Sequence, residues 1–108
     1  MLHPEQTYRV EISADGVSCR HPHGLVETVR WDELQAVLLE TNDQGPFAMD
    51  VYWILIGDQG GCVIPQGAIG EQELLRRLQM LDGFDSHAVI QAMLSTDNQR
   101  FLCWERPV

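Results

Sequence analysis

The sequence predicts an α+β domain, an antiparallel β-sheet or split barrel of about six strands followed by two helices and a short final strand. Apolar and polar residues alternate between Tyr8 and Trp31, which is the period of half-buried strands. After Gly70 the leucines recur at three- and four-residue spacing instead, as in a helix that buries one face. With 108 residues and no linker or repeat, we expect a single domain spanning residues 1–108.

The first strands form a meander. Asp15-Gly16 tolerates the positive φ of a tight turn, and Pro22-His23-Gly24 is a second turn signal. These turns separate three alternating segments, at residues 8–13, 17–21 and 25–31. Each segment is predicted to be a strand with one buried face.

Residues 34–41 carry two patterns. Leu34, Val37 and Leu38 suit one face of a helix, whereas the β-rich surroundings and the turn-forming residues 42–46 favour a strand. The sequence leaves both readings open.

The middle of the chain predicts two further strands. Residues 51–56 are apolar at every position, which is typical of a central strand with both faces covered. Gly60-Gly61 then turns the chain into a strand at 62–64, which Pro65 ends.

Two helices follow. The first begins near Gly70 with Glu71 and Glu73 at its positive end, and its buried stripe is Leu74, Leu75, Leu78 and Leu81. Asp85 or Ser86 caps the second, whose expected buried stripe is Val89, Ile90 and Met93. Residues 101–104 are expected to form a last strand or an extended tail that packs on the core.

Three motifs carry a resemblance to a known family. They are Asp15-Gly16, the stretch from Trp31-Asp32-Glu33-Leu34 to Val37, and Ile64-Pro65-Gln66. In this order they resemble small bacterial pleckstrin-homology-like domains over residues 8–81, with the chain from Asp82 onward as an addition. The resemblance implies a binding platform, since such domains share a fold while serving unrelated roles.

The charge excludes some partners and favours others. Sixteen acidic residues face seven arginines and no lysine, for a net charge of −9. This excess repels phosphate backbones and anionic lipids, so we expect neither nucleic-acid nor membrane binding, and it favours encounter with a basic protein. The start lacks the pattern of a signal peptide, and the odd number of three cysteines suggests free thiols. Both point to the cytoplasm.

The cysteines and histidines that could bind a metal or act in catalysis have simpler structural explanations. Cys19, His21 and His23 would share a strand face as zinc ligands, but Pro22 breaks the strand and a fourth ligand is missing. The remaining cysteines lie in apolar segments, where a thiol is usually inert. We therefore expect no catalytic residue, no cofactor and no metal, and hence no enzyme.

The segment 40–50 is the best candidate for partner binding. It reads as a long loop with an apolar anchor among carboxylates, and the residues expected to contact the partner are Glu40, Asp43, Phe47 and Asp50. The leading hypothesis is a non-enzymatic module that binds a basic protein, as inhibitors of the immunity type do.

Two alternatives stay open. One is a small enzyme or small-ligand-binding domain with a pocket between the sheet and the terminal helices, using His21, His23, Asp32 and Cys62. The other is a homodimer formed through an unpaired strand edge or around Trp104.

Overall fold

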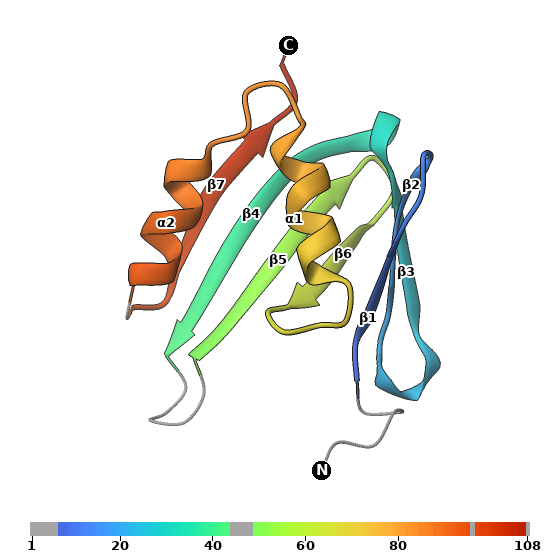
Figure 1. Cartoon of the computed structure of the whole chain (residues 1–108), viewed down its shortest axis with the longest axis horizontal. Coiled ribbons are helices and arrows are strands. Elements are labelled where there is room, and N and C mark those ends of the chain that lie inside the picture. The colour runs from blue at the N-terminus through green and yellow to red at the C-terminus, as the bar shows by residue number, and fades with distance from the viewer. Residues whose placement is uncertain (1–6, 44–48, 96, 108) are drawn as a thin grey trace.

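A computed structural model describes residues 7–43, 49–95 and 97–107, apart from the side chains of Asp43, Met49 and Asp50. Its elements in chain order are β1 (Arg9–Ile12), β2 (Gly16–Arg20), the 3-10 turn η2 (Pro22–Gly24), β3 (Val26–Arg30), the 3-10 turn η3 (Trp31–Glu33), β4 (Leu34–Asp43), β5 (Met49–Gly57), β6 (Gly61–Pro65), α1 (Glu71–Gln79), α2 (Ser86–Leu94) and β7 (Gln99–Glu105). Figure 1 shows this α+β layout, which confirms the predicted fold class.

The strands form two antiparallel sheets. One has the order β1-β2-β3 and the other the order β6-β5-β4-β7. Residues 34–41 belong to a strand, which settles the question that their spacing left open. In β4 the buried residues Val37, Leu39 and Thr41 alternate with partly exposed ones. This period of two is imposed because β4 pairs on one side with β5 and on the other with β7.

β7 returns from the helices to the four-stranded sheet and forms its edge strand beside β4. It pairs with β4 from Ala36 opposite Glu105 to Thr41 opposite Gln99. The last segment is thus a strand within the sheet rather than a tail packed against it.

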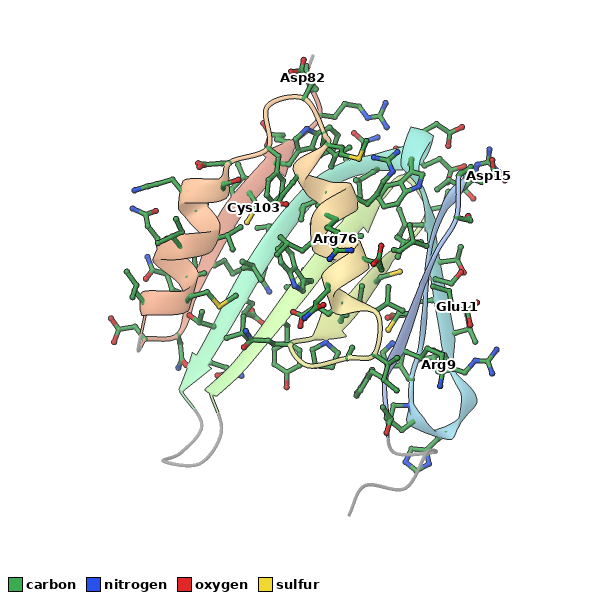
Figure 2. The ribbon with its side chains drawn as sticks, viewed as in Figure 1. Arg9, Glu11, Asp15, Arg76, Asp82 and Cys103 are labelled. Carbon is green, nitrogen blue, oxygen red and sulfur yellow. The ribbon has the colours of Figure 1, made fainter. Side chains whose placement is uncertain are left out.

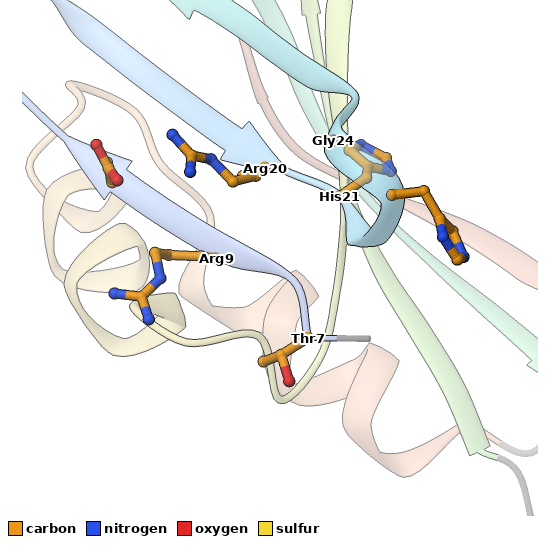
Figure 3. A pocket seen from close by; sticks show the side chains of 7 residues that line it. Thr7, Arg9, Arg20, His21 and Gly24 are labelled. Carbon is orange, nitrogen blue, oxygen red and sulfur yellow. The ribbon is translucent and has the colours of Figure 1, made fainter. Parts of the chain in front are cut away.

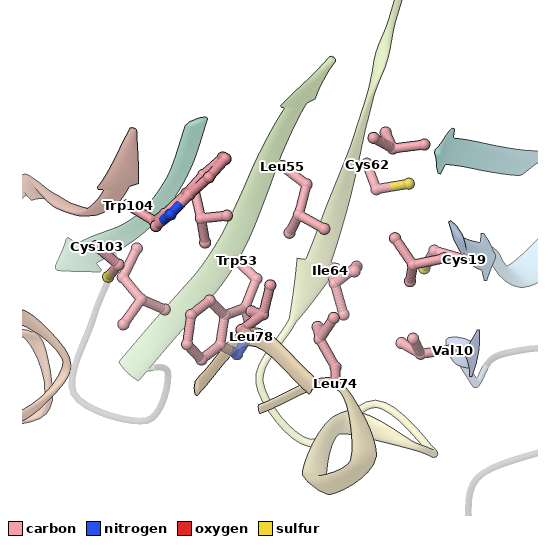
Figure 4. Close-up of a cluster of buried hydrophobic side chains, with 14 of the residues drawn as sticks. Val10, Cys19, Trp53, Leu55, Cys62, Ile64, Leu74, Leu78, Cys103 and Trp104 are labelled. Carbon is pink, nitrogen blue, oxygen red and sulfur yellow. The ribbon is translucent and has the colours of Figure 1, made fainter. Parts of the chain in front are cut away.

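The core lies between the inner face of the four-stranded sheet, the three-stranded sheet and the two helices. Both helices lie on the same side of the four-stranded sheet (Figure 1). Figure 4 shows the centre of the core, where Trp53, Leu55 and Ile64 meet Leu74 and Leu78 of α1. All five side chains are at most 1% exposed.

The buried stripe predicted for α2 is partly wrong. Ala88 and Ala92 are buried against the sheet, whereas Ile90 is 59% exposed. Small side chains face the sheet because they let the helix approach β7 and β4 closely, and this rotates Ile90 outward. The predicted cap is confirmed, since the Asp85 carboxylate accepts a hydrogen bond from the Ala88 N–H at 3.1 Å.

The segment before α1 joins the helix to the three-stranded sheet. The N–H of Val10 donates to the carbonyl of Ile69 at 2.7 Å, and the N–H of Ile69 donates to the carbonyl of Tyr8 at 2.9 Å. Gly70 follows with φ 92°, and a Cβ there would collide with the carbonyl oxygen of Val10. Glycine is therefore required both for the backbone conformation and for the close approach of β1.

The described part of the chain contains no helix that could cross a membrane. Each of its two α-helices has nine residues.

Candidate interaction surfaces

The four-stranded sheet has an apolar face that points away from the helices. The antiparallel register aligns one side chain from each strand across it, in the order Val63, Ile54, Leu38 and Leu102. We call the side of the sheet that carries this row the outer face. Val63 is 41% exposed and Leu102 is 49% exposed, so the row is open at both ends.

Two further rows flank this apolar row. On one side the register aligns Gly61, Ile56, Ala36 and Glu105, and on the other it aligns Pro65, Tyr52, Glu40 and Arg100. Ile56 is 44% exposed. Within these three rows charged groups occur only on the two strands at one side, β4 and β7. Large apolar side chains grouped on an open sheet face mark a contact surface more often than a free one.

The outer face corrects the expectation for residues 51–56. β5 is central in its sheet, but only its inner residues Val51, Trp53 and Leu55 are buried. Ile56 on the other side reaches solvent. The uniformly apolar run predicted that other elements would cover both faces of this strand. The described elements cover only its inner face.

β4 and β5 extend beyond their neighbours at one end of the sheet. The β7 ladder stops at Thr41 and the β6 ladder stops at Tyr52. The β4–β5 ladder continues for two more rungs, which pair Asn42 with Asp50 and Asp43 with Met49. We call these two rungs the acidic ribbon.

The structure places the predicted partner-binding residues only in part. Residues 40–43 and 49–50 belong to β4 and β5, so the described part of the expected loop is strand. Glu40 lies on the outer face, where its Oε1 accepts a hydrogen bond from Nε of Arg100 at 2.9 Å. Asp43 and Asp50 are placed by their backbone alone, and Phe47 lies outside the described residues.

An open hollow lies on the outer side of the three-stranded sheet (Figure 3). Its volume is about 620 Å³, and its charged or titratable lining residues are Arg9, Glu11, Arg20, His21 and His23. Arg9 lies directly opposite Arg20 across β1 and β2. Within the described residues neither guanidinium has an ion pair, whereas Arg30, Arg76 and Arg100 each pair with a carboxylate.

The residues weighed as zinc ligands do not converge. Nε2 of His21 lies 2.6 Å from Oε1 of Glu27, and Cys19 is buried. His23 is exposed at φ 76°, a left-handed conformation at the turn. Nowhere in residues 7–43, 49–95 and 97–107 do three histidine, cysteine or acidic side chains gather in a way that could hold a metal ion.

The three thiols are protonated at neutral pH. Burial, and secondarily the charge of Glu27, raises the pKa of Cys19 to about 11 and that of Cys62 to about 12. Burial, and secondarily the charge of Asp85, raises the pKa of Cys103 to about 11. A thiol of this kind is a weak nucleophile at pH 7.

Asp32, which the competing hypothesis placed at a ligand pocket, pairs with a neighbouring surface residue. Its carboxylate accepts hydrogen bonds from Arg30 in the preceding strand at 3.2 and 3.4 Å. This hydrogen bond lowers the pKa of Asp32 and raises that of Arg30. Both side chains are exposed, so the pair belongs to the surface.

Comparison with known proteins finds no family model, no curated protein and no solved structure that matches this chain.

Proposed function

We propose that this chain is a non-enzymatic protein-binding module that meets a basic protein with the acidic ribbon and the adjoining end of the four-stranded sheet. The observation that carries the proposal is the extension of β4 and β5 past both neighbouring strands. Its rungs contain Asp43 and Asp50, and Glu40 lies two residues before Asn42, where the ribbon begins in β4. Arg100 is the only basic residue in the four strands of this sheet.

A two-stranded extension suits contact with a partner. Beyond Thr41 and Tyr52 the described part of the sheet places no third strand beside the ladder, so a partner can approach it from either edge. Carboxylates at such a site attract a basic protein and speed its encounter, and the net charge of −9 adds long-range attraction. The small size and the acidity favour an inhibitor of the immunity type that acts in the cytoplasm.

The state of the thiols supports a non-enzymatic role. Their raised pKa values are the opposite of what an activated nucleophile requires. In addition, Trp53, Leu74 and Leu78 fill the space between the sheet and α1 (Figure 4), where the competing hypothesis placed a ligand pocket.

A double charge reversal tests the assignment of the ribbon. In one variant Asp43→Lys and Asp50→Lys are combined. The matched control combines Asp15→Lys and Asp82→Lys, which change the net charge equally at exposed turns far from the ribbon (Figure 2). The tagged protein is captured from its own lysate, and bound proteins are identified by native mass spectrometry at rising salt.

The wild type is expected to retain a stoichiometric basic protein that salt releases. With that partner purified, the ribbon variant should associate at least about tenfold more slowly, and the control should change by much less. Equal losses in both variants would show that total charge matters and the ribbon does not. Capture of an acidic partner would contradict the proposal.

The hollow of Figure 3 favours a second candidate, binding of a small anion. Arg9 and Arg20 lie opposite each other across β1 and β2 without an ion pair among the described residues, and a bound anion would reduce the repulsion between these like charges even though Glu11 also lines the hollow. Titration calorimetry with inorganic phosphate and with citrate tests it. Heat that is lost in Arg20→Gln and kept in Arg76→Gln would support this function.

A further inference from the structure

The outer face carries a charge pattern with internal symmetry. Its middle row is wholly apolar and crosses all four strands, from Val63 to Leu102. The two flanking rows differ at the β7 end, where one carries Arg100 and the other carries Glu105. A basic and an acidic group therefore stand on opposite sides of the apolar row on the same strand.

A two-fold rotation about the middle row makes this pattern self-complementary. The rotation lays the outer face of one protomer on that of its partner and keeps the strands of the two sheets aligned, as in ordinary sheet packing. Each flanking row then covers the other flanking row of the partner. Arg100 faces the partner's Glu105, and Glu105 faces the partner's Arg100.

The other side chains of the outer face are compatible with this two-fold arrangement. Glu40 is already neutralised by Nε of Arg100, and it would face the partner's Ala36. Ile56 would face the partner's Tyr52. The rotation thus buries the exposed apolar side chains and creates two opposite-charge contacts without setting like charges against each other.

The size of the face indicates a weak dimer. Strands about 4.8 Å apart with a rise of about 3.4 Å per residue give a face four strands wide and seven residues long about 19 by 24 Å. That is on the order of 450 Å² for each copy, or about 900 Å² for the two together, which is smaller than a standard specific interface and in the range of weak, transient contacts. Dimerisation should accordingly depend on concentration within the experimental range.

We infer that the outer face is a homodimer interface and that its occupant is a second copy of this chain. The inference goes beyond the proposed function and does not depend on it. The rotation leaves the acidic ribbons free, because each ribbon extends past the row that carries Glu40 and the two ribbons therefore lie at opposite ends of the dimer.

Sedimentation equilibrium of the purified full chain between about 1 μM and 1 mM tests the inference. We expect a monomer–dimer equilibrium that tightens as salt rises, because salt screens the repulsion between two chains of net charge −9. Binding of a basic partner should weaken with salt, so the two proposals can fail independently. A monomer at every concentration and salt level would overturn the inference.

A leucine pair on opposite sides of the molecule gives matched variants. Leu102→Glu places two carboxylates in the interface, by symmetry, and should weaken the dimer at least about tenfold. Leu94→Glu adds the same charge on α2, where Leu94 is 78% exposed, and should leave the dimer unchanged. A dimer that survives Leu102→Glu, or that Leu94→Glu breaks, would place the contact elsewhere.

A charge exchange tests the rotation itself. Glu105→Arg alone sets two arginines against each other and should weaken the dimer, and adding Arg100→Glu should restore part of the affinity. If the double variant bound no more tightly than Glu105→Arg, the two-fold arrangement would be wrong. Thermal unfolding of each variant in dilute solution shows that it is folded, so that loss of dimer is not mistaken for loss of structure.

Discussion

The carboxylate of Glu27 in β3 accepts a hydrogen bond from the backbone N–H of Val63 in β6, with nitrogen and Oε1 3.0 Å apart. The same oxygen lies 2.6 Å from Nε2 of His21. β3 and β6 are edge strands of different sheets. One side chain thus satisfies a donor at the edge of the second sheet and holds the two sheets together.

Truncating Glu27 should loosen this junction. Glu27→Ala leaves the Val63 N–H and the His21 ring without their acceptor, so we expect a loss of about 1–3 kcal/mol in the free energy of unfolding by urea. Glu27→Gln keeps an acceptor and should lose less. Glu11→Ala, an exposed position in β1, is the control. Equal stability of the Glu27→Ala and Glu11→Ala variants would show that the junction contributes nothing.

Glu71 and Glu73 form a matched pair with different roles. Glu71 accepts from Nε1 of the buried Trp53 and from the N–H of Gly67, both at 2.9 Å. Glu73 pairs only with the exposed Arg76 among the described residues. Glu71→Ala should cost about 1–3 kcal/mol in unfolding free energy because it leaves a buried indole N–H unsatisfied.

Glu73→Ala, by comparison, should cost less than about 1 kcal/mol. Chemical denaturation followed by circular dichroism measures both variants. A Glu73→Ala variant as unstable as Glu71→Ala would mean that charge at the helix N-terminus outweighs the bond to Trp53.

Arg106 should be required for the turn between β3 and β4. Its Nε donates to the carbonyl of Leu34 at 2.8 Å, and its Nη2 donates to the carbonyls of Asp32 at 2.6 Å and Trp31 at 3.4 Å. Arg106→Ala should lower the unfolding free energy by about 1.5–3 kcal/mol. Arg106→Lys should recover only part, because an ammonium group lacks the planar fork.

The exposed Arg76 offers the control for that series. Arg76→Ala removes the same side chain from a surface pair and should change stability by less than about 1 kcal/mol. If hydrogen exchange of the amides in η3 were equally fast in Arg106→Ala, Arg76→Ala and the wild type, Arg106 would not be required for this turn.

Because of the three buried thiols, we expect the free energy of unfolding to decrease at alkaline pH. Because folding raises their pKa values from 9.0 to about 11 or 12, the fold favours the neutral thiols. Their contribution is complete below the unfolded value and is lost as pH rises through the folded values. Unfolding free energy should therefore fall between about pH 9 and 12, and less steeply in Cys62→Ala.

Thiol labelling at neutral pH is a second readout. All three cysteines should react only at the rate of unfolding. One thiol that reacted quickly in the native protein would contradict their buried state and revive the enzyme hypothesis.

The sequence was sufficient for most of the fold because its periods are local. The alternation before Trp31 and the leucine spacing after Gly70 determine strand and helix without reference to distant residues. For residues 34–41 the local pattern was ambiguous, and pairing with β5 on one side and with β7, from the far end of the chain, on the other decided it. Which side of α2 is buried depends on how closely the helix packs against the sheet. The spacing of residues along the helix carries no information about that distance.

The surfaces were less predictable for the same reason. Glu40 was singled out for its charge, but its partner Arg100 is 60 residues away and is brought opposite only by the register of β7. The outer face was missed because Ile54 and Ile56 read as residues of a doubly covered strand. Whether such a strand is covered on one face or two depends on where the helices pack.

The position of β7 bears on how the protein is made. Until residues 99–105 have been synthesised and have passed the helices, β4 has a free edge of ten residues that carries Leu38 and Leu39. A free apolar edge can pair with a strand of another chain. Closing the sheet over so long a stretch of sequence is also slow. Nascent and C-terminally shortened chains should therefore aggregate readily and depend on chaperones.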